Sequence, residues 1–135
     1  MATPIPQRVI TISLKQINNE LRAFYTFLSP LTGNMFIDAP SCDIECNQPT
    51  NTLFVLDFAS SAAGWTIVDT SRKAPSLPLP HKSGPSDQSV QVYNPHIDDT
   101  TKYSFYINYK NTVTGETKPI DPQEGNIPRI YGNLD

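Results

Sequence analysis

Proline constrains this chain more than any other residue, because 13 of the 135 residues are proline. Average usage is about 5%, so proline occurs here at about twice the usual frequency. A proline inside a helix removes a backbone donor, and its ring clashes with the preceding turn. The segments between the prolines are short and rich in Val, Ile, Thr, Tyr and Phe. That composition is typical of strands separated by turns, and it predicts an all-β domain.

The alternation of apolar and polar residues locates the individual strands. The segment 21–28 fits both a strand and a helix, but Asn18 and Asn19 before it are turn formers and Pro30 closes it. We therefore expect it to be the returning strand of a hairpin. Strands are predicted over residues 9–15, 21–28, 35–37, 53–58, 65–69, 89–93, 103–110 and 116–120.

Three segments are predicted to lack strands. Residues 40–51 form a polar connection, residues 59–64 a turn, and residues 72–87 a long loop with four prolines. The segment 53–58, by contrast, is a continuous apolar run, which fits a central strand buried on both faces.

About seven or eight short strands joined by turns predict a two-sheet antiparallel β-sandwich. The length suits a single domain over residues 1–135. Asp99, Tyr103 and Phe105 have the spacing of the tyrosine corner of immunoglobulin-like domains, and Trp65 would be the core tryptophan. We expect one shared core that contains Leu53, Val55, Trp65, Ile67, Tyr103 and Phe105.

Charge and hydropathy limit the class of protein, its partners and its location in the cell. The net charge is only −3, which does not suit a disordered chain. A pI near 5.2 without a basic cluster argues against nucleic acid as a partner. The apolar runs are too short to span a bilayer, so no membrane association is expected. The first six residues lack the basic start and apolar core of a signal peptide, which predicts a cytoplasmic protein.

Cys42 and Cys46 are the two cysteines of the chain. On a strand, residues four apart lie about 13 Å apart, which is too far for a disulfide. On a turn they could meet, and with His81 and His96 they could contribute to a zinc site. A reducing compartment favours two free thiols over these two alternatives.

His96, Asp98 and Asp99 form the most suggestive polar cluster, because imidazole and carboxylates can act as base or metal ligands. The same residues beside Pro95 are also ordinary turn chemistry, which we favour. Together with His81 they remain weak candidates for a metal site. The chain lacks a G-x-S-x-G elbow, a phosphate-binding glycine loop and an H-E-x-x-H motif. We therefore expect neither an enzyme nor a cofactor.

The C-terminal third resembles a known group. Residues 103–109, a glycine turn, and the segment 120–128 with Asp121-Pro122 are similar to the close of the small bacterial DP-EP proteins. Those proteins in turn resemble, more distantly, the PixA/AidA inclusion-body proteins. The resemblance implies an intracellular bacterial β-sandwich without established chemistry, and it transfers no catalytic residue.

Three functions follow as hypotheses. The segment 103–109 carries aromatic residues on both faces, and these need cover on both sides, so we expect a homo-oligomer. If that strand or its neighbour 116–120 lies at a sheet edge, the simplest case is a dimer that extends the sheet. The alternative is a small-ligand or carbohydrate-binding module that uses Trp65 or the tyrosines as stacking platforms. A more remote alternative is a metal-dependent enzyme built on His81, His96, Asp98 and Asp99.

Overall fold

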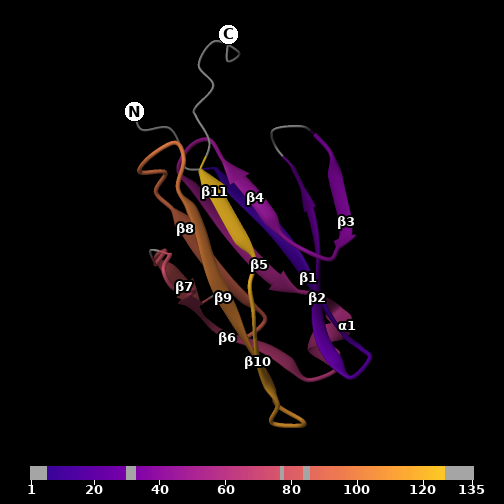
Figure 1. The fold of residues 1–135 in the computed structure, drawn as a ribbon. Helices are drawn as coiled ribbons and strands as arrows, with labels where there is room; N and C mark the ends of the chain where they lie inside the picture. The colour runs from indigo at the N-terminus through magenta and orange to yellow at the C-terminus, as the bar shows by residue number, and fades with distance from the viewer. Residues whose placement is uncertain (1–5, 30–32, 77, 84–85, 127–135) are drawn as a thin grey trace.

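The computed structural model describes residues 6–29, 33–76, 78–83 and 86–126, and their strands form two sheets packed face to face (Figure 1). The first sheet has six strands in the order β3 (Met35–Ala39), β2 (Glu20–Leu28), β1 (Gln7–Ile17), β5 (Thr50–Leu56), β8 (Ser89–Asn94) and β7 (His81–Ser83). The second contains β6 (Trp65–Arg72), β9 (Lys102–Asn111), β10 (Thr117–Ile120), β11 (Gln123–Asn126) and β4 (Asp43–Cys46). The expected all-β sandwich is confirmed.

The β1–β2 hairpin resolves the ambiguous segment in favour of a strand. β2 pairs antiparallel with β1, and its residues alternate between core and surface. Asn18 and Asn19 connect the two strands with φ angles of 53° and 64°. Asparagine tolerates this left-handed conformation, and two such residues match the twist of the flanking strands.

After the turn that follows β9, the chain runs back along β9 through β10 and then β11. Ile120 of β10 lies opposite Ile107, and Gln123 of β11 lies opposite Ser104, so the register is unbroken across the gap. The gap falls at Asp121 and Pro122, where proline has no N–H for the ladder. β11 then pairs with β4 on its other side.

β9 lies inside its sheet, because β6 pairs with it along Trp65–Arg72 while β10 and β11 pair with it along 102–110. Of the two candidate edges, the strand 103–109 is therefore interior. Its inward side chains are covered by the six-stranded sheet, and Ile107 and Tyr109 are buried. Its neighbour β10 does lie at the end of the sheet order.

Short elements account for the other differences from the sequence-based expectation. β4 lies within the segment 40–51, and β7 lies within the segment 72–87, both of which were expected to be irregular. Strands of four and three residues are too short to show alternation. Together with β11 they raise the number of strands above the expected seven or eight. Two pairings, β1 with β5 and β11 with β4, are parallel rather than antiparallel.

The core lies between the two sheets, and most of the expected members are in it. The inward side chains of β6 and β9 that the sequence assigned to the core are buried in one cluster, and they are Trp65, Ile67, Tyr103 and Phe105. This part of the prediction is confirmed.

β5 faces the core with the opposite set of residues from the one expected. Leu53 and Val55 are half-buried on the outer face, while Phe54 and Leu56 point inward. Phe54 packs edge-to-face on Phe105 with ring centroids 6.0 Å apart. A continuous apolar run does not reveal which alternate set faces the core, so the opposite sheet decides it. The expectation that this strand is buried on both faces is therefore wrong, because its outer face is only half-buried.

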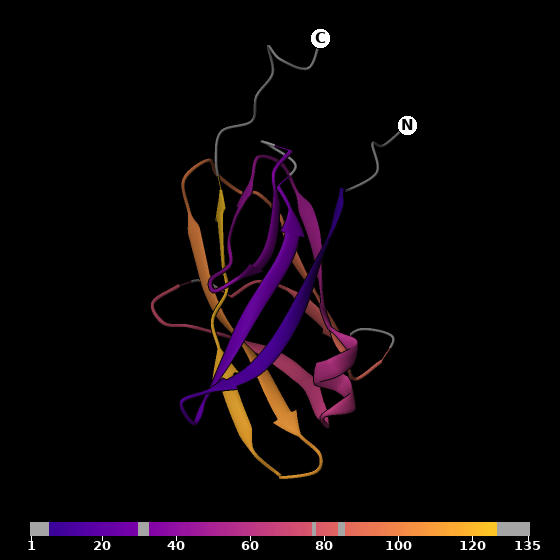
Figure 2. The same cartoon turned by 90° about the vertical axis from the view of Figure 1, so that its right-hand side faces the viewer.

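A short helix, α1 (Phe58–Ala62), replaces the expected turn and lies beside the lower ends of the strands (Figure 2). Asp57 caps it by accepting a 2.8 Å hydrogen bond from the Ser60 N–H. Burial alone would raise the pKa of Asp57, but hydrogen bonds from Ser60 and Ser13 and the charge of Lys15 together lower it. The described residues contain no helix long and apolar enough to cross a membrane.

We expect Ser60→Ala to destabilise the protein by about 1–3 kcal/mol. The buried Ser60 hydroxyl accepts a 2.8 Å hydrogen bond from the Leu14 N–H of β1, and its loss leaves that N–H buried without a partner. Urea unfolding measures the effect. Ser61→Ala, on the same helix, is the control and should change the free energy of unfolding by about 0.5 kcal/mol or less. Equal unfolding midpoints for the two variants would contradict the prediction.

Candidate functional site

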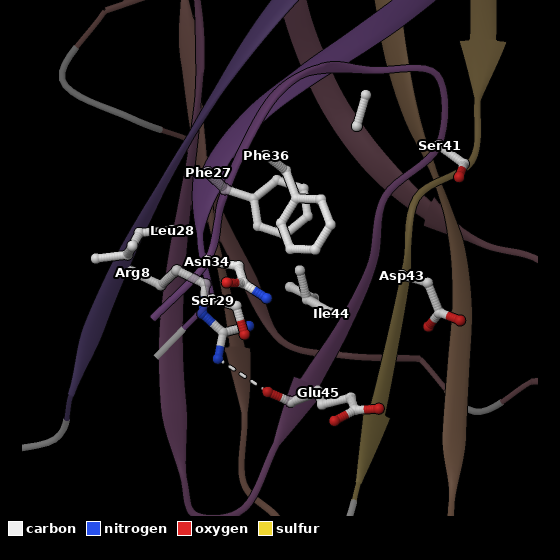
Figure 3. Close-up of a pocket in the computed structure, with 11 residues that line it drawn as sticks. Arg8, Phe27, Leu28, Ser29, Asn34, Phe36, Ser41, Asp43, Ile44 and Glu45 are labelled. Atoms are coloured by element: carbon white, nitrogen blue, oxygen red, sulfur yellow. Dashed lines mark hydrogen bonds between the residues drawn. The ribbon is translucent and has the colours of Figure 1, made fainter. Parts of the chain in front are cut away.

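A groove lies between β3 and β4, at the edge where the two sheets meet (Figure 3). We call it the β3–β4 groove. Its volume is about 460 Å³. Side chains from β1, β2, β3 and β4 and from the adjoining turns line it, and they are Arg8, Phe27, Leu28, Ser29, Asn34, Phe36, Ala39, Ser41, Asp43, Ile44 and Glu45.

Two stacked phenylalanines form the apolar wall of the groove. Phe27 of β2 and Phe36 of β3 are directly opposite in the sheet, and their rings lie 5.0 Å apart at an angle of 22°. Phe27 belongs to the core, whereas Phe36 is 42% exposed. Ile44 of β4 lies below the rings (Figure 3) and is buried. The apolar core therefore continues into the groove and is exposed at the surface there.

A β-bulge shapes the closed end of the groove. The register of β2 and β3 shifts between Tyr25 and Phe27, and Asp38 on β3 has a φ angle of 50°. The Asp38 N–H donates a 3.1 Å hydrogen bond to the Thr26 hydroxyl oxygen, which holds the bulge in place. Bulges bend a strand. Here the bend precedes Pro40, from which the chain crosses to β4 in the other sheet.

Arg8 brings a positive charge to the open end of the groove. It lies on β1 in the same alternate set as Ile10 and Ile12, both of which are fully buried. One guanidinium nitrogen, Nη2, donates a 2.9 Å hydrogen bond to the Glu45 carbonyl oxygen (Figure 3). The Nε atom is buried, and in the described part of the chain it has no hydrogen-bond partner. The guanidinium therefore retains unused donors beside an apolar wall.

The two acidic residues of the lining lie across the groove from this charge. Asp43 and Glu45 alternate with buried residues on β4, so their side chains are exposed. Figure 3 shows both carboxylates on the β11 side, away from the Arg8 guanidinium. The groove thus has a cationic end and an acidic outer rim.

The sequence-predicted cluster around His96 forms a turn. The Asp98 carboxylate accepts hydrogen bonds from the N–H groups of Thr100 and Thr101, at 3.0 and 2.8 Å, and from the Thr101 hydroxyl. His96 has a φ angle of 51°, and its N–H donates to the Asn94 side chain at 2.9 Å. Asp99 is exposed beside them. These hydrogen bonds support the turn interpretation of the cluster.

The remaining metal candidates lie on other elements. His81 is exposed on β7, at an edge of the six-stranded sheet. Cys42 and Cys46 are buried and are not joined in a disulfide. Cys42 precedes β4, and Cys46 is its last residue. Among the described residues, no three His, Cys, Asp or Glu side chains come close enough to hold a metal ion.

Two of the aromatic residues proposed as sugar platforms, Trp65 and Tyr106, are covered by other parts of the chain. Trp65 is only 5% exposed and belongs to the core. Tyr106 points outward from β9, but Lys73 lies over its ring with Nζ 5.7 Å from the centroid. Lys73 also forms a 2.6 Å ion pair with Asp121, which raises the Lys73 pKa. The ion pair holds the lysine above the ring where a sugar would stack.

Sequence reasoning missed the residues that form the β3–β4 groove. A usable signal existed for Arg8, because it shares the alternate set of Ile10 and Ile12 and so had to face inward. No comparable signal existed for Phe36, because its position in the groove depends on the bulge at Asp38 and on the crossing to β4.

Comparison with known proteins adds no family assignment. No protein-family model matches the chain, and no curated protein is similar to it. The resemblance of the C-terminal third to DP-EP and PixA/AidA proteins therefore stays a prediction.

Proposed function

We propose that this chain is a non-enzymatic interaction protein that works by associating with a second copy of itself through β3. The observation that carries the proposal is the exposure of three successive apolar residues on one edge strand. Met35 is 58% exposed, Phe36 is 42% exposed and Ile37 is 72% exposed. An apolar edge strand with unpaired backbone groups is a template for pairing with another strand.

Three other edge strands of the described residues carry features that oppose pairing. β4 presents Asp43 and Glu45, and β10 contains Lys118 and Pro119. β7 is three residues long and includes Lys82. Charged side chains, prolines and short strands are the usual protections of sheet edges. β3 contrasts with them, because its first three residues are all apolar.

The outer face next to β3 extends the apolar surface. Leu28 lies opposite Met35 in the sheet and is 51% exposed, and Val9 of β1 is 54% exposed. These residues point away from the core, together with Met35 and Ile37. Antiparallel pairing of two β3 strands would join both six-stranded sheets and bring the two apolar surfaces into contact.

Charge is compatible with a symmetric pair. In a two-fold dimer, a residue at the centre of the interface meets its own copy, so an uncompensated charge there would repel itself. Asp38 is the charged residue of β3, and Lys15 lies 4.0 Å from its carboxylate. The apolar residues 35–37 then meet without opposed charges, which favours a second copy as the partner.

We expect sedimentation at micromolar concentrations to give a particle of twice the 15.0 kDa chain mass. Ile37→Lys should give a monomer, because the lysine places a charge in the paired edge. The matched control is Val113→Lys, since Val113 is 79% exposed in the β9–β10 turn and should not affect assembly. A wild-type monomer at every concentration would refute self-association. A dimer that survives Ile37→Lys would refute β3 as its interface.

A further inference from the structure

We infer that the β3–β4 groove binds a small amphipathic carboxylate, an organic acid whose apolar body lies against Phe36 and whose carboxylate meets Arg8. This inference does not depend on self-association. Phe36 faces the groove because it lies opposite the core residue Phe27, whereas Met35 and Ile37 point to the other face of β3. Met35 and Ile37 of the association surface thus lie on the opposite side of β3 from Phe36, whereas Leu28 borders both surfaces.

The apolar part of the ligand is indicated by the wall of the groove. The Phe27 and Phe36 rings stack on each other, and Phe36 remains 42% exposed. Leu28 and Ile44 extend this wall on either side. A volume of about 460 Å³ lies within the range of small-molecule pockets, which combine apolar walls with a few polar groups. An aromatic or aliphatic body would cover the exposed ring.

The anionic part is indicated by Arg8. Among the described residues, no carboxylate forms an ion pair with its guanidinium, and one hydrogen bond, to the Glu45 carbonyl oxygen, is formed. Arginine has five donors in a planar fork that matches the two oxygens of a carboxylate. The apolar wall beside it lowers the local polarity, which strengthens a charge-assisted contact. A carboxylate is the group that completes this arrangement.

The acidic rim supplies the competing hypothesis, which is a cationic ligand. Asp43 and Glu45 are exposed and lie on the β11 side, away from Arg8 (Figure 3). Exposed carboxylates are screened by water and salt, whereas the Arg8 side chain is partly buried. The cation-binding alternative is therefore weaker, and the experiment below tests it directly.

The test compares three probes with the same phenylpropyl body and different head groups. They are 3-phenylpropionate, 3-phenylpropan-1-ol and 3-phenylpropylammonium, each titrated into the full ¹⁵N-labelled chain and followed by backbone amide shifts. We expect the carboxylate to bind about tenfold or more tightly than the alcohol, which is the effect of one charge-assisted contact. The shifts should centre on Arg8, Leu28 and Phe36. Equal affinities, preference for the ammonium, shifts elsewhere or no binding would each overturn the inference.

A substitution locates the charge that recognises the carboxylate. Arg8→Gln should weaken binding of 3-phenylpropionate about tenfold and leave binding of the alcohol unchanged. Arg72→Gln is the matched control, because Arg72 is exposed on β6 and does not line the groove. Undiminished carboxylate binding by Arg8→Gln would overturn the assignment. If that variant fails to fold, the comparison of the three probes on the unaltered chain decides the question.

Discussion

Trp65→Ala should lower the free energy of unfolding by about 3–5 kcal/mol, because the substitution removes the largest side chain type from a packed core. Trp65 is 5% exposed at the start of β6, where it lies opposite Asn111 of β9. Its ring is part of the cluster that both sheets bury. Folded domains are stable by only about 5–15 kcal/mol, so the variant should lose about a fifth or more of its stability. Urea unfolding at neutral pH measures the loss.

The matched control for this variant is Val68→Ala. Val68 lies on the same strand but is 52% exposed, because it alternates with the inward-facing Trp65 and Ile67. Its truncation should cost about 0.5 kcal/mol or less. If Trp65→Ala also cost less than about 1 kcal/mol, Trp65 would not be a core residue and a role in ligand stacking would regain support.

Alkali should destabilise the protein steeply because the core buries tyrosines, among them Tyr25 and Tyr109. Tyr25 and Tyr109 are each 1% exposed. Burial raises the pKa of both phenols above the ordinary value near 10, with further contributions at Tyr25 from Cys42 and Asp121. A group whose folded-state pKa is raised contributes stability that is complete below the unfolded pKa and is lost as the pH rises above it. The loss therefore begins near pH 10.

Above about pH 10, each buried phenol should lower the free energy of unfolding by about 1.4 kcal/mol per pH unit. The two together should lower it by roughly 3 kcal/mol by about pH 11. Urea unfolding at about pH 8 and about pH 11 measures this loss. In the double variant Tyr25→Phe, Tyr109→Phe, the free energy of unfolding should fall by roughly 3 kcal/mol less over this interval than in the unaltered chain. Neither hydroxyl has a hydrogen-bond partner among the described residues, so the double variant should remain stable at neutral pH. Identical pH dependence in both proteins would contradict the prediction.

The edges of the sheets show where local sequence stops being informative. The strand 103–109 carries aromatic residues on both faces and was one of two candidate edges, yet β9 lies between β6 and the β10–β11 line. The residues of a strand do not show how many other strands will pair with it, because its partners come from distant segments of the chain. The apolar surface that remains uncovered belongs instead to β3, where the short run 35–37 gave no such indication.

The sequence by itself determined the fold class, the β1–β2 hairpin and the core positions on β6 and β9. These features depend on local chemistry: prolines exclude long helices, asparagines accept left-handed turns, and alternation marks the two faces of a strand. The tertiary structure alone decided that Phe54 rather than Leu53 faces the core, that β9 is interior, and that Phe36 and Arg8 meet in one groove. Each of these depends on packing between segments far apart in the chain, and side-chain periodicity within one strand carries no record of the strand that it will face.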